Sequence, residues 1–242
     1  MKSRIKEDDS SVPYFNNQYW YYTRYETGKQ YPIFCRKKGS MEAKEEVMFD
    51  VNQMAEGHDY YQLNGIEISP DNTLAAFGID TVSRRQYTLR IKNLVTGEIY
   101  PDKIDNTTGG STFANDNKTL FYTLKNPTTL RSERILKHKL GESTTQDQSV
   151  FFEEDETFNT WVSKSKSEQY IFVGSYSTLS SEVRFINANN PDDNFKIVQP
   201  RTRGLEYDVS HYGDKFYVVT NADNATNFKL MSTPVTATDR SN

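Results

Sequence analysis

Cysteine and histidine are scarce in this chain of 242 residues, which holds one cysteine (Cys35) and three widely separated histidines (His58, His138 and His211). A single cysteine excludes an internal disulfide and any metal site built from several cysteines, and it fits the reducing cytosol. We interpret Cys35 as a small apolar core residue, since no basic or histidine partner can be assigned to its thiol. The sequence therefore assigns no metal-binding residue and implies no cofactor.

Long apolar runs and an excess of positive charge are also missing. No run approaches the ~20 apolar residues of a transmembrane helix, and no signal-peptide pattern opens the chain. Lysine and arginine number 29 against 33 aspartates and glutamates, a formal net charge of -4. A nucleic-acid-binding domain normally carries a basic surface instead. We therefore predict a cytoplasmic protein that binds neither membranes nor nucleic acid.

The motifs of common enzyme classes are absent as well. The sequence has no Gly-x-Ser-x-Gly nucleophile elbow, no P-loop and no dinucleotide fingerprint, and the serines of the polar loop 175–181 sit in no such elbow. Gly109-Gly110 lacks the lysine–hydroxyl pair of a phosphate loop, so we interpret it as a flexible turn. His58 and Asp59 are adjacent, but adjacent side chains seldom face each other and no nucleophile accompanies them. No catalytic, cofactor-binding or substrate-binding residue is assigned.

Aromatic residues, in contrast, are abundant: 16 tyrosines and 14 phenylalanines help to bring the aromatic fraction to 13%. Flat rings pack well on a pleated sheet, so this composition favours strands. The stretch Gly65–Tyr100 shows the pattern in full, with three short apolar runs and a fourth run that closes the unit. The cluster Pro70-Asp71-Asn72 supplies its first turn and Thr96-Gly97 its last. This stretch predicts four short strands joined by tight turns.

The same pattern recurs along the chain at intervals of roughly 45 to 50 residues, which suits a four-stranded propeller blade. Each repeat begins with a strand, a polar turn and a second strand. We align these turns as Ile68–Asp71, Phe113–Asp116, Val162–Ser165 and Val209–Tyr212. A single blade cannot bury both of its faces, so neighbouring blades must stack. The sequence therefore predicts an all-β fold, a partial β-propeller.

We predict one domain over residues 1–242, and its last unit stops after three strands. A closed propeller needs a full ring whose ends meet. We therefore expect a piece of a larger ring, with exposed strand edges that pair with another chain, for example near Tyr19 and Phe228. The predicted parts are a lead-in at 1–18 and about four to five blades at approximately 19–57, 65–104, 111–154, 160–198 and 207–234.

Two charged segments carry alternative interpretations. The connector 80–86 contains Arg84-Arg85, which is either an exposed loop or a contact to another domain or an acidic ligand. The run Glu153-Glu154-Asp155-Glu156 places four carboxylates in a row. Such a run is either a solvated outer-rim loop or an electronegative rim that attracts basic peptides. The sequence alone leaves both pairs of alternatives open.

A series of short segments runs in order over essentially the whole chain. They are Glu7–Tyr14, Tyr21–Arg24, Asp50–Asn52 with Ala55–His58, Ser69–Asn72, Arg84–Arg90, Ala114–Asn117 with Leu120–Tyr122, and Arg203–Tyr207. A single piece such as Ser-Pro-Asp is common in propellers, whereas the ordered set is specific. The set resembles oligopeptidase B (protease II), a branch of the prolyl oligopeptidase family of serine peptidases.

The resemblance implies a seven-bladed propeller that caps an α/β-hydrolase domain. The Ser-Asp-His triad and the acidic residues that select arginine or lysine would lie mainly in that hydrolase domain, which this chain lacks. No catalytic residue of the family can therefore be placed on a position here. The resemblance implies a gating and substrate-filtering propeller, inactive alone, whose partners are its own hydrolase domain and short basic peptides. A free-standing propeller-like binding module without enzymatic activity is the alternative.

Overall fold

The computed structural model describes residues 6–238, which fall into two compact units. The described part of the first unit comprises residues 6–63 and 80–84, and that of the second comprises residues 64–79 and 85–238. Within these residues the secondary structure is β-strand apart from one short α-helix and one 3-10 turn. The prediction of an all-β fold is confirmed.

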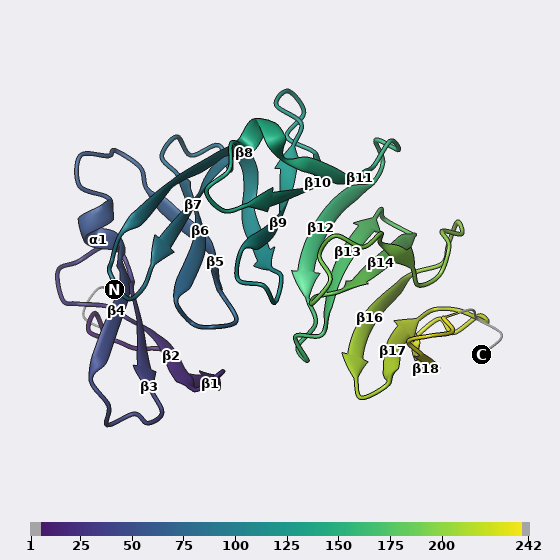
Figure 1. The fold of residues 1–242 in the computed structure, drawn as a ribbon, viewed down its shortest axis with the longest axis horizontal. Helices are drawn as coiled ribbons and strands as arrows, with labels where there is room; N and C mark the ends of the chain where they lie inside the picture. The colour runs from purple at the N-terminus through teal and green to yellow at the C-terminus, as the bar shows by residue number, and fades with distance from the viewer. Residues whose placement is uncertain (1–5, 239–242) are drawn as a thin grey trace. The chain divides into compact units, whose positions relative to one another are not determined.

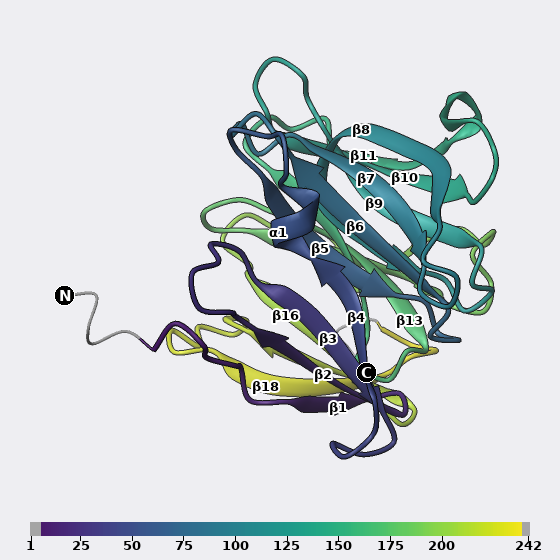
Figure 2. The ribbon, with the colours of Figure 1, turned by 90° about the vertical axis from the view of Figure 1, so that its left-hand side faces the viewer.

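The first unit is a four-stranded antiparallel sheet in the order β1-β2-β3-β4 (Figure 2). Its strands are β1 (Tyr14–Asn16), β2 (Tyr19–Arg24), β3 (Ile33–Lys38) and β4 (Glu45–Asp50). We call this sheet blade 1. Strand β1 lies inside the segment 1–18 that the sequence suggested as a lead-in, and it pairs with β2 through the two-residue turn Asn17-Gln18. Tyr19 therefore lies on a strand with neighbours on both sides, so the sheet edge next to it is β1.

Blade 1 is followed by the helix α1 (Val51–Met54), whose N-cap is Asp50. The Asp50 carboxylate accepts a hydrogen bond from the Asn52 backbone N–H at 3.0 Å, which satisfies one of the free donors of the first turn. Cys35 points into the core of this unit and is fully buried, and burial raises the pKa of its thiol to about 11. Cys35 is therefore a core residue and not a reactive thiol.

The second unit contains a seven-stranded sheet in the order β11-β10-β9-β8-β7-β6-β5. Its central strand β8 serves two blades. The first part of β8 pairs with β7, as in Leu89↔Ile104, and the second part pairs with β9, as in Thr112↔Phe121. The strands are β5 (Gln62–Ile68), β6 (Leu74–Asp80), β7 (Tyr87–Asn93), β8 (Ile99–Phe113), β9 (Thr119–Lys125), β10 (Ser132–Lys139) and β11 (Gln148–Phe152), with the 3-10 turn η2 (Thr144–Gln146) before β11.

We call the strands β5 to β7 with the first part of β8 blade 2, and the second part of β8 with β9 to β11 blade 3. Gly109-Gly110 lies at the transition between them, inside the strand, so the prediction of a flexible turn at this point is wrong. The physical reason is close packing of backbone on backbone. An ideal Cβ on Gly78 would lie 2.5 Å from the Gly109 Cα, and one on Gly109 would lie 2.8 Å from the Tyr87 ring. Glycine allows the strand to pass from one blade to the next at this short distance.

Two further sheets complete the second unit (Figure 1). Blade 4 has the order β12-β13-β14-β15, and blade 5 has the order β16-β17-β18. Their strands are β12 (Asn159–Lys164), β13 (Tyr170–Tyr176), β14 (Ser181–Asn187), β15 (Lys196–Ile197), β16 (Tyr207–Tyr212), β17 (Lys215–Thr220) and β18 (Lys229–Pro234).

The turn after the inner strand has the same hydrogen bonds in blades 2, 3 and 4. The backbone N–H groups of Ser69, Ala114 and Ser165 each donate to the carbonyl five residues later. Ser165 is therefore equivalent to Ser69 and Ala114, so the sequence alignment of Val162–Ser165 with Ile68–Asp71 is wrong by two residues. The alignment of Val209–Tyr212 is wrong in the same way, because His211 pairs with Phe216 as Phe113 pairs with Leu120. The same numbers of residues separate the paired strands in all three turns, and this spacing decides the register.

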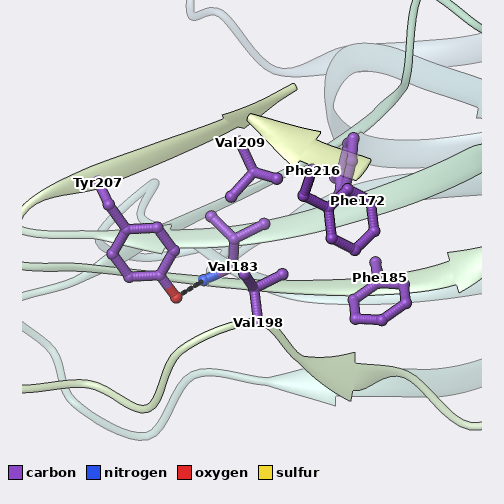
Figure 3. Packing of buried hydrophobic residues seen from close by; sticks show 7 residues of the cluster. All are labelled: Phe172, Val183, Phe185, Val198, Tyr207, Val209 and Phe216. Carbon is purple, nitrogen blue, oxygen red and sulfur yellow. Dashed lines mark hydrogen bonds between the residues drawn. The ribbon is translucent and has the colours of Figure 1, made fainter. Parts of the chain in front are cut away.

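The core between blades 4 and 5 is aromatic and aliphatic. Seven buried side chains form one cluster, and the Tyr207 hydroxyl at its end accepts a hydrogen bond from Val183 N at 2.8 Å (Figure 3). The same hydroxyl donates to Gln199 O at 2.6 Å. The ring of Tyr207 thus packs in the core, while its hydroxyl forms hydrogen bonds with backbone groups. The cluster comprises Phe172, Val183, Phe185, Val198, Tyr207, Val209 and Phe216.

Candidate functional site: polar contacts between neighbouring blades

The structure does not bring the histidines and charged segments that stand out in the sequence together in a catalytic arrangement. In the first unit His58 and Asp59 are exposed, and the His58 ring lies against Tyr61 at 5.4 Å between ring centroids. Arg84 and Arg85 are also exposed. The Arg84 backbone N–H donates to an Asp80 carboxylate oxygen at 3.0 Å, a bond that shapes the turn itself. These residues form local contacts, and the buried polar side chains of the second unit are the more informative group.

Glu153 links blade 3 to the blades that follow. It belongs to the connection between β11 and β12, and its side chain is only 5% exposed. Both guanidinium Nη atoms of Arg201, from the connection between β15 and β16, donate to the two Glu153 carboxylate oxygens. The Ser175 hydroxyl at the end of β13 donates to the same carboxylate. The Arg201 guanidinium also lies 3.7 Å from the centroid of the Phe158 ring.

The electrostatics of Glu153 follow from these partners. Burial alone would raise the pKa of the carboxyl, but the hydrogen bonds from Arg201 and Ser175 outweigh it and hold the pKa below its usual value. Of the four acidic residues in the run, Glu153 therefore forms an internal ion pair with Arg201, while Glu154, Asp155 and Glu156 are exposed. The idea of a rim of four solvent-facing carboxylates is wrong for Glu153, because this side chain points inward.

A second cluster joins the inner strands of blades 2, 3 and 4. Glu67 on β5 accepts a hydrogen bond from the Thr112 hydroxyl on β8 at 3.1 Å. Burial raises the pKa of the Glu67 carboxyl to about 7, and the hydrogen bond from Thr112 only partly offsets this. Burial also lowers the pKa of the nearby Lys164 ammonium on β12. Acidic and basic groups thus share a poorly solvated site at which the carboxyl changes its charge near neutral pH.

A third cluster ties the outer strand of blade 2 to blade 3. His138 on β10 is fully buried, with Nδ1 2.6 Å from Asp147 Oδ1 and Nε2 2.9 Å from Asp102 Oδ1. Asp102 lies on β8 and also accepts from the Gly141 N–H at 2.6 Å, while the Tyr122 hydroxyl donates to Asp147 at 2.8 Å. Burial, and then the bond to Asp147, raises the pKa of the Tyr122 phenol. The network connects three strands and the η2 turn.

The third histidine lies between blades 4 and 5. His211 on β16 is 6% exposed, and its Nδ1 lies 2.7 Å from the Ser167 hydroxyl in the β12–β13 turn. Burial lowers the pKa of the His211 imidazole. In the part of the chain that the structure describes, one histidine bonds a serine and another bonds aspartates, and none bonds both. A Ser-His-Asp constellation is therefore not formed among residues 6–238.

Two further classes of site find no support among the described residues. No group of three or more histidine, cysteine, aspartate or glutamate side chains could hold a metal ion within residues 6–238. Over the same residues, the structure contains no helix with the length and apolar character that a membrane crossing requires. The polar clusters between the blades consist of buried hydrogen bonds and ion pairs that join neighbouring strands.

Comparison with known proteins places this geometry in a family. The model of the prolyl oligopeptidase N-terminal β-propeller domain matches residues 1–242. The chain belongs to this family. The blades and the connections between them are therefore parts of a propeller domain, and the prediction of a partial β-propeller is confirmed, as is the resemblance to this peptidase family.

The relatives are peptidases by name. The chain is 42% identical to dipeptidyl aminopeptidase BI of Pseudoxanthomonas mexicana over 98% of its own length, and 33% identical to protease 2 of Moraxella lacunata over 97%. It spans 35% of the length of each of these two proteins. The similar region is thus about a third of each relative.

Solved structures agree with this placement. Oligopeptidase B from Leishmania major matches 95% of the chain with a TM-score of 0.89 and 32% identity, over 33% of that protein. Oligopeptidase B from Trypanosoma brucei matches 98% of the chain with a TM-score of 0.90 and 25% identity, over 34% of that protein. These matches cover both units of the chain.

Sequence reasoning missed the polar clusters between the blades. Glu67 and His211 lie on strands that the sequence identified, but their surroundings depend on which neighbouring blade covers them. In the register set by the turn hydrogen bonds and the strand pairings, Lys164 and His211 take the place of Phe113, so two titratable residues stand where blade 3 has an apolar one. The sequence alignment put Val162 and Val209 at these positions, so the signal became visible only in the structure.

Proposed function

We propose that this chain is the non-catalytic propeller part of an oligopeptidase B-like serine endopeptidase that cleaves short peptides after arginine or lysine. The observation that carries the proposal is the match of the propeller model to the whole chain, together with the resemblance to relatives named as proteases. The described histidines support it, because each is engaged in a structural contact. The chain alone is expected to be inactive, and the protein to be cytoplasmic.

In this proposal the propeller acts as a gate. A rigid stack of blades in front of an active site excludes large or folded substrates by volume, and motion of the blades or of the whole domain sets the rate of entry. The partner of the chain is then its own α/β-hydrolase domain, and short basic peptides are the ligands of the complete enzyme. The polar clusters between the blades support such a role, because they decide how firmly neighbouring blades are held together.

The test compares the 242-residue chain with the complete protein that the gene encodes. We expect a blocked arginyl amide to be hydrolysed by the complete protein and left intact by the chain. The sequence of the gene beyond the Asn242 codon should contain Gly-x-Ser-x-Gly followed by aspartate and histidine. Hydrolysis by the purified chain, or a stop codon directly after Asn242, would contradict the proposal, and the stop codon would favour a free-standing binding module.

A second candidate activity follows from the relative with 42% identity, which is named a dipeptidyl aminopeptidase. Release of dipeptides requires a free amino terminus on the substrate, whereas an endopeptidase accepts blocked substrates. Parallel assays of the complete protein with a free dipeptidyl amide and its N-blocked counterpart separate the two. Cleavage of the free substrate alone would replace the endopeptidase assignment by a dipeptidyl aminopeptidase one.

We also propose that the isolated chain self-associates through its end strands. In blade 5 the edge strand β18 carries Leu230, which is 68% exposed, and Phe228 just before it is also exposed. Unpaired edges of this kind tend to pair with another chain. Light scattering should show concentration-dependent dimers that the Leu230→Lys variant weakens. A monodisperse monomer across a wide concentration range would argue against this.

A further inference from the structure

We call the contact surface between blades 4 and 5 the seam. Polar contacts hold it at both ends of the inner strand β16. At its beginning, the Tyr207 N–H donates to the Ser181 hydroxyl at 2.7 Å, and the Tyr207 hydroxyl also bonds blade 4. Towards its end, His211 shares a hydrogen bond of 2.7 Å with the Ser167 hydroxyl of the β12–β13 turn. The histidine end is the one that can change charge at mildly acidic pH.

The His211 ring is enclosed by aromatic side chains. Its centroid lies 4.6 Å from that of Tyr170 in blade 4 and 5.7 Å from that of Phe216 in blade 5, both in edge-on orientations. The ring thus forms part of the contact between the two sheets, in addition to its hydrogen bond. A charge placed on this ring would be poorly solvated.

The second ring nitrogen of His211 is the sensitive atom. His211 Nε2 is buried and has no hydrogen-bond partner among the described residues. In the neutral ring only one nitrogen carries a proton, and Ser167 can act as donor or acceptor because its hydroxyl also lies 2.9 Å from that of Ser165. A second proton would add a buried N–H and a positive charge, and only the Gly213 backbone favours that charged form. The neutral ring fits this seam, and the charged ring does not.

No carboxylate compensates such a charge. The charged residues on the neighbouring segments are Lys166 and Glu168 in the β12–β13 turn, and Asp214 and Lys215 in the β16–β17 turn, with Tyr170 as the titratable ring in contact. None of them forms an ion pair or hydrogen bond with His211 among the described residues. Burial lowers the pKa of the imidazole, the hydrogen bond to the Gly213 backbone raises it by less, and no opposite charge offsets the burial.

We propose that His211 is an acid-sensitive latch: neutral His211 holds the end of β16 against the β12–β13 turn, and protonated His211 releases it. The Tyr207 end stays attached, so acidification loosens one end of the seam between blades 4 and 5. The device goes beyond the proposed gating role, because it does not depend on which peptide is cleaved. It gives the propeller a pH-dependent stiffness at one seam.

The register of the repeats supplies the variant for a test. Phe113 occupies in blade 3 the position that His211 occupies in blade 5. His211→Phe therefore introduces a residue that the fold already accommodates at the equivalent position of another blade. His211→Asn is the second variant, because it keeps a polar atom near Ser167 and does not titrate. His58→Gln is the matched control, since His58 is exposed and lies in the other unit.

The melting temperature of the 242-residue chain is measured at pH 7.5 and pH 5.0 for all four proteins. Because the folded chain binds fewer protons at His211 than the unfolded chain does, wild type should lose stability as the pH falls below the ordinary histidine range. We expect the loss on acidification to be larger by about 2–4 °C in wild type and His58→Gln than in His211→Phe and His211→Asn. Equal losses in all four proteins would overturn the latch.

Two site-specific readouts locate the effect. In a histidine NMR titration, His211 should gain its proton below the ordinary histidine range. The protection of the backbone amides of residues 211–216 against hydrogen exchange, taken relative to the intrinsic exchange rate at each pH, should fall on acidification in wild type and not in His211→Phe. A midpoint for His211 within or above the ordinary histidine range, or a loss of protection confined to other segments, would contradict the proposal even if a variant folded poorly.

Discussion

Glu168 holds the left-handed backbone position that Asn117 holds in the preceding repeat, with φ angles of 59° and 57°. Asn72 has the same role one repeat earlier, with φ of 63°. Asparagine tolerates this conformation because its short side chain bonds locally, whereas a glutamate gains nothing from it. Comparison of the repeats thus indicates that the backbone at Glu168 is strained. It also indicates that an asparagine at this position would relieve the strain.

Glu168→Asn should therefore stabilise the chain by about 0.5–1 kcal/mol, measured as a rise in the urea midpoint at unchanged slope. Glu156→Asn serves as the control, because Glu156 is exposed and its φ is not among the positive ones. The control should change stability by less than about 0.5 kcal/mol. Burial lowers the pKa of the Lys164 ammonium and the Glu168 carboxylate partly offsets this, so the two charges attract each other. A loss of stability in Glu168→Asn would show that this attraction outweighs the backbone strain.

Glu153→Gln tests the ion pair that joins blade 3 to Arg201. The substitution keeps the shape of the side chain but removes the carboxylate that both Nη atoms of Arg201 bond, and leaves Glu182, 3.9 Å from Nη2, as the remaining ion-pair partner. We expect a loss of about 2–4 kcal/mol in the free energy of unfolding. Glu154→Gln, next to it in the sequence and exposed, should be nearly neutral. A double-mutant cycle with Arg201→Gln should give a coupling energy above about 1 kcal/mol, and a value near zero would refute the link.

The acidic run shows how far sequence alone could reach. Four carboxylates in a row have the same appearance in the sequence, yet Glu153 is buried because Arg201, 48 residues later, comes back to it from another blade connection. The repeats, the strands and the family could be predicted from the sequence, since they depend on local pattern and turn chemistry. The register of the Ser165 turn and the partner of each buried charge were not, because they depend on which blade covers which strand.

Gly109-Gly110 gives the same lesson for the backbone. In sequence, two glycines between polar residues are typical of a loop. In the structure they lie in the strand β8 that passes from blade 2 to blade 3, and Gly109 is needed because Gly78 and Tyr87 lie against its backbone. A single sequence does not distinguish a glycine required by close approach of another backbone from a glycine required by a turn. The positions of the neighbouring strands were needed to decide between the two.

Glu67→Gln tests the buried carboxyl between the inner strands. The pKa of Glu67 in the folded chain is about 7, above its unfolded value, so the folded chain holds the proton more tightly and loses stability as the pH rises through neutrality. The glutamine variant cannot ionise. It should match wild type at pH 5 and exceed it by about 1–3 kcal/mol at pH 8.

The measurement is denaturant unfolding at both pH values, with the exposed Glu98→Gln as control. The control should follow wild type at both. If Glu67→Gln is less stable than wild type at pH 8, the ionised carboxylate must be held by Lys164 in the folded chain, and the attraction would then exceed the cost of burial.

Gly78→Ala tests the close packing of backbone at the transition between blades 2 and 3. The added Cβ would lie 2.5 Å from the Gly109 Cα, a distance that only a backbone shift can relieve. We expect a loss of about 2–3 kcal/mol in the free energy of unfolding. Gly110→Ala is the matched control, because the nearest atom to its added Cβ is the Thr108 hydroxyl at 3.9 Å and its φ is not in the left-handed region. Its alanine should be neutral or stabilising by up to about 1 kcal/mol. If both variants lost the same stability, flexibility of the glycine pair, and not the space between the strands, would be the property that the fold requires.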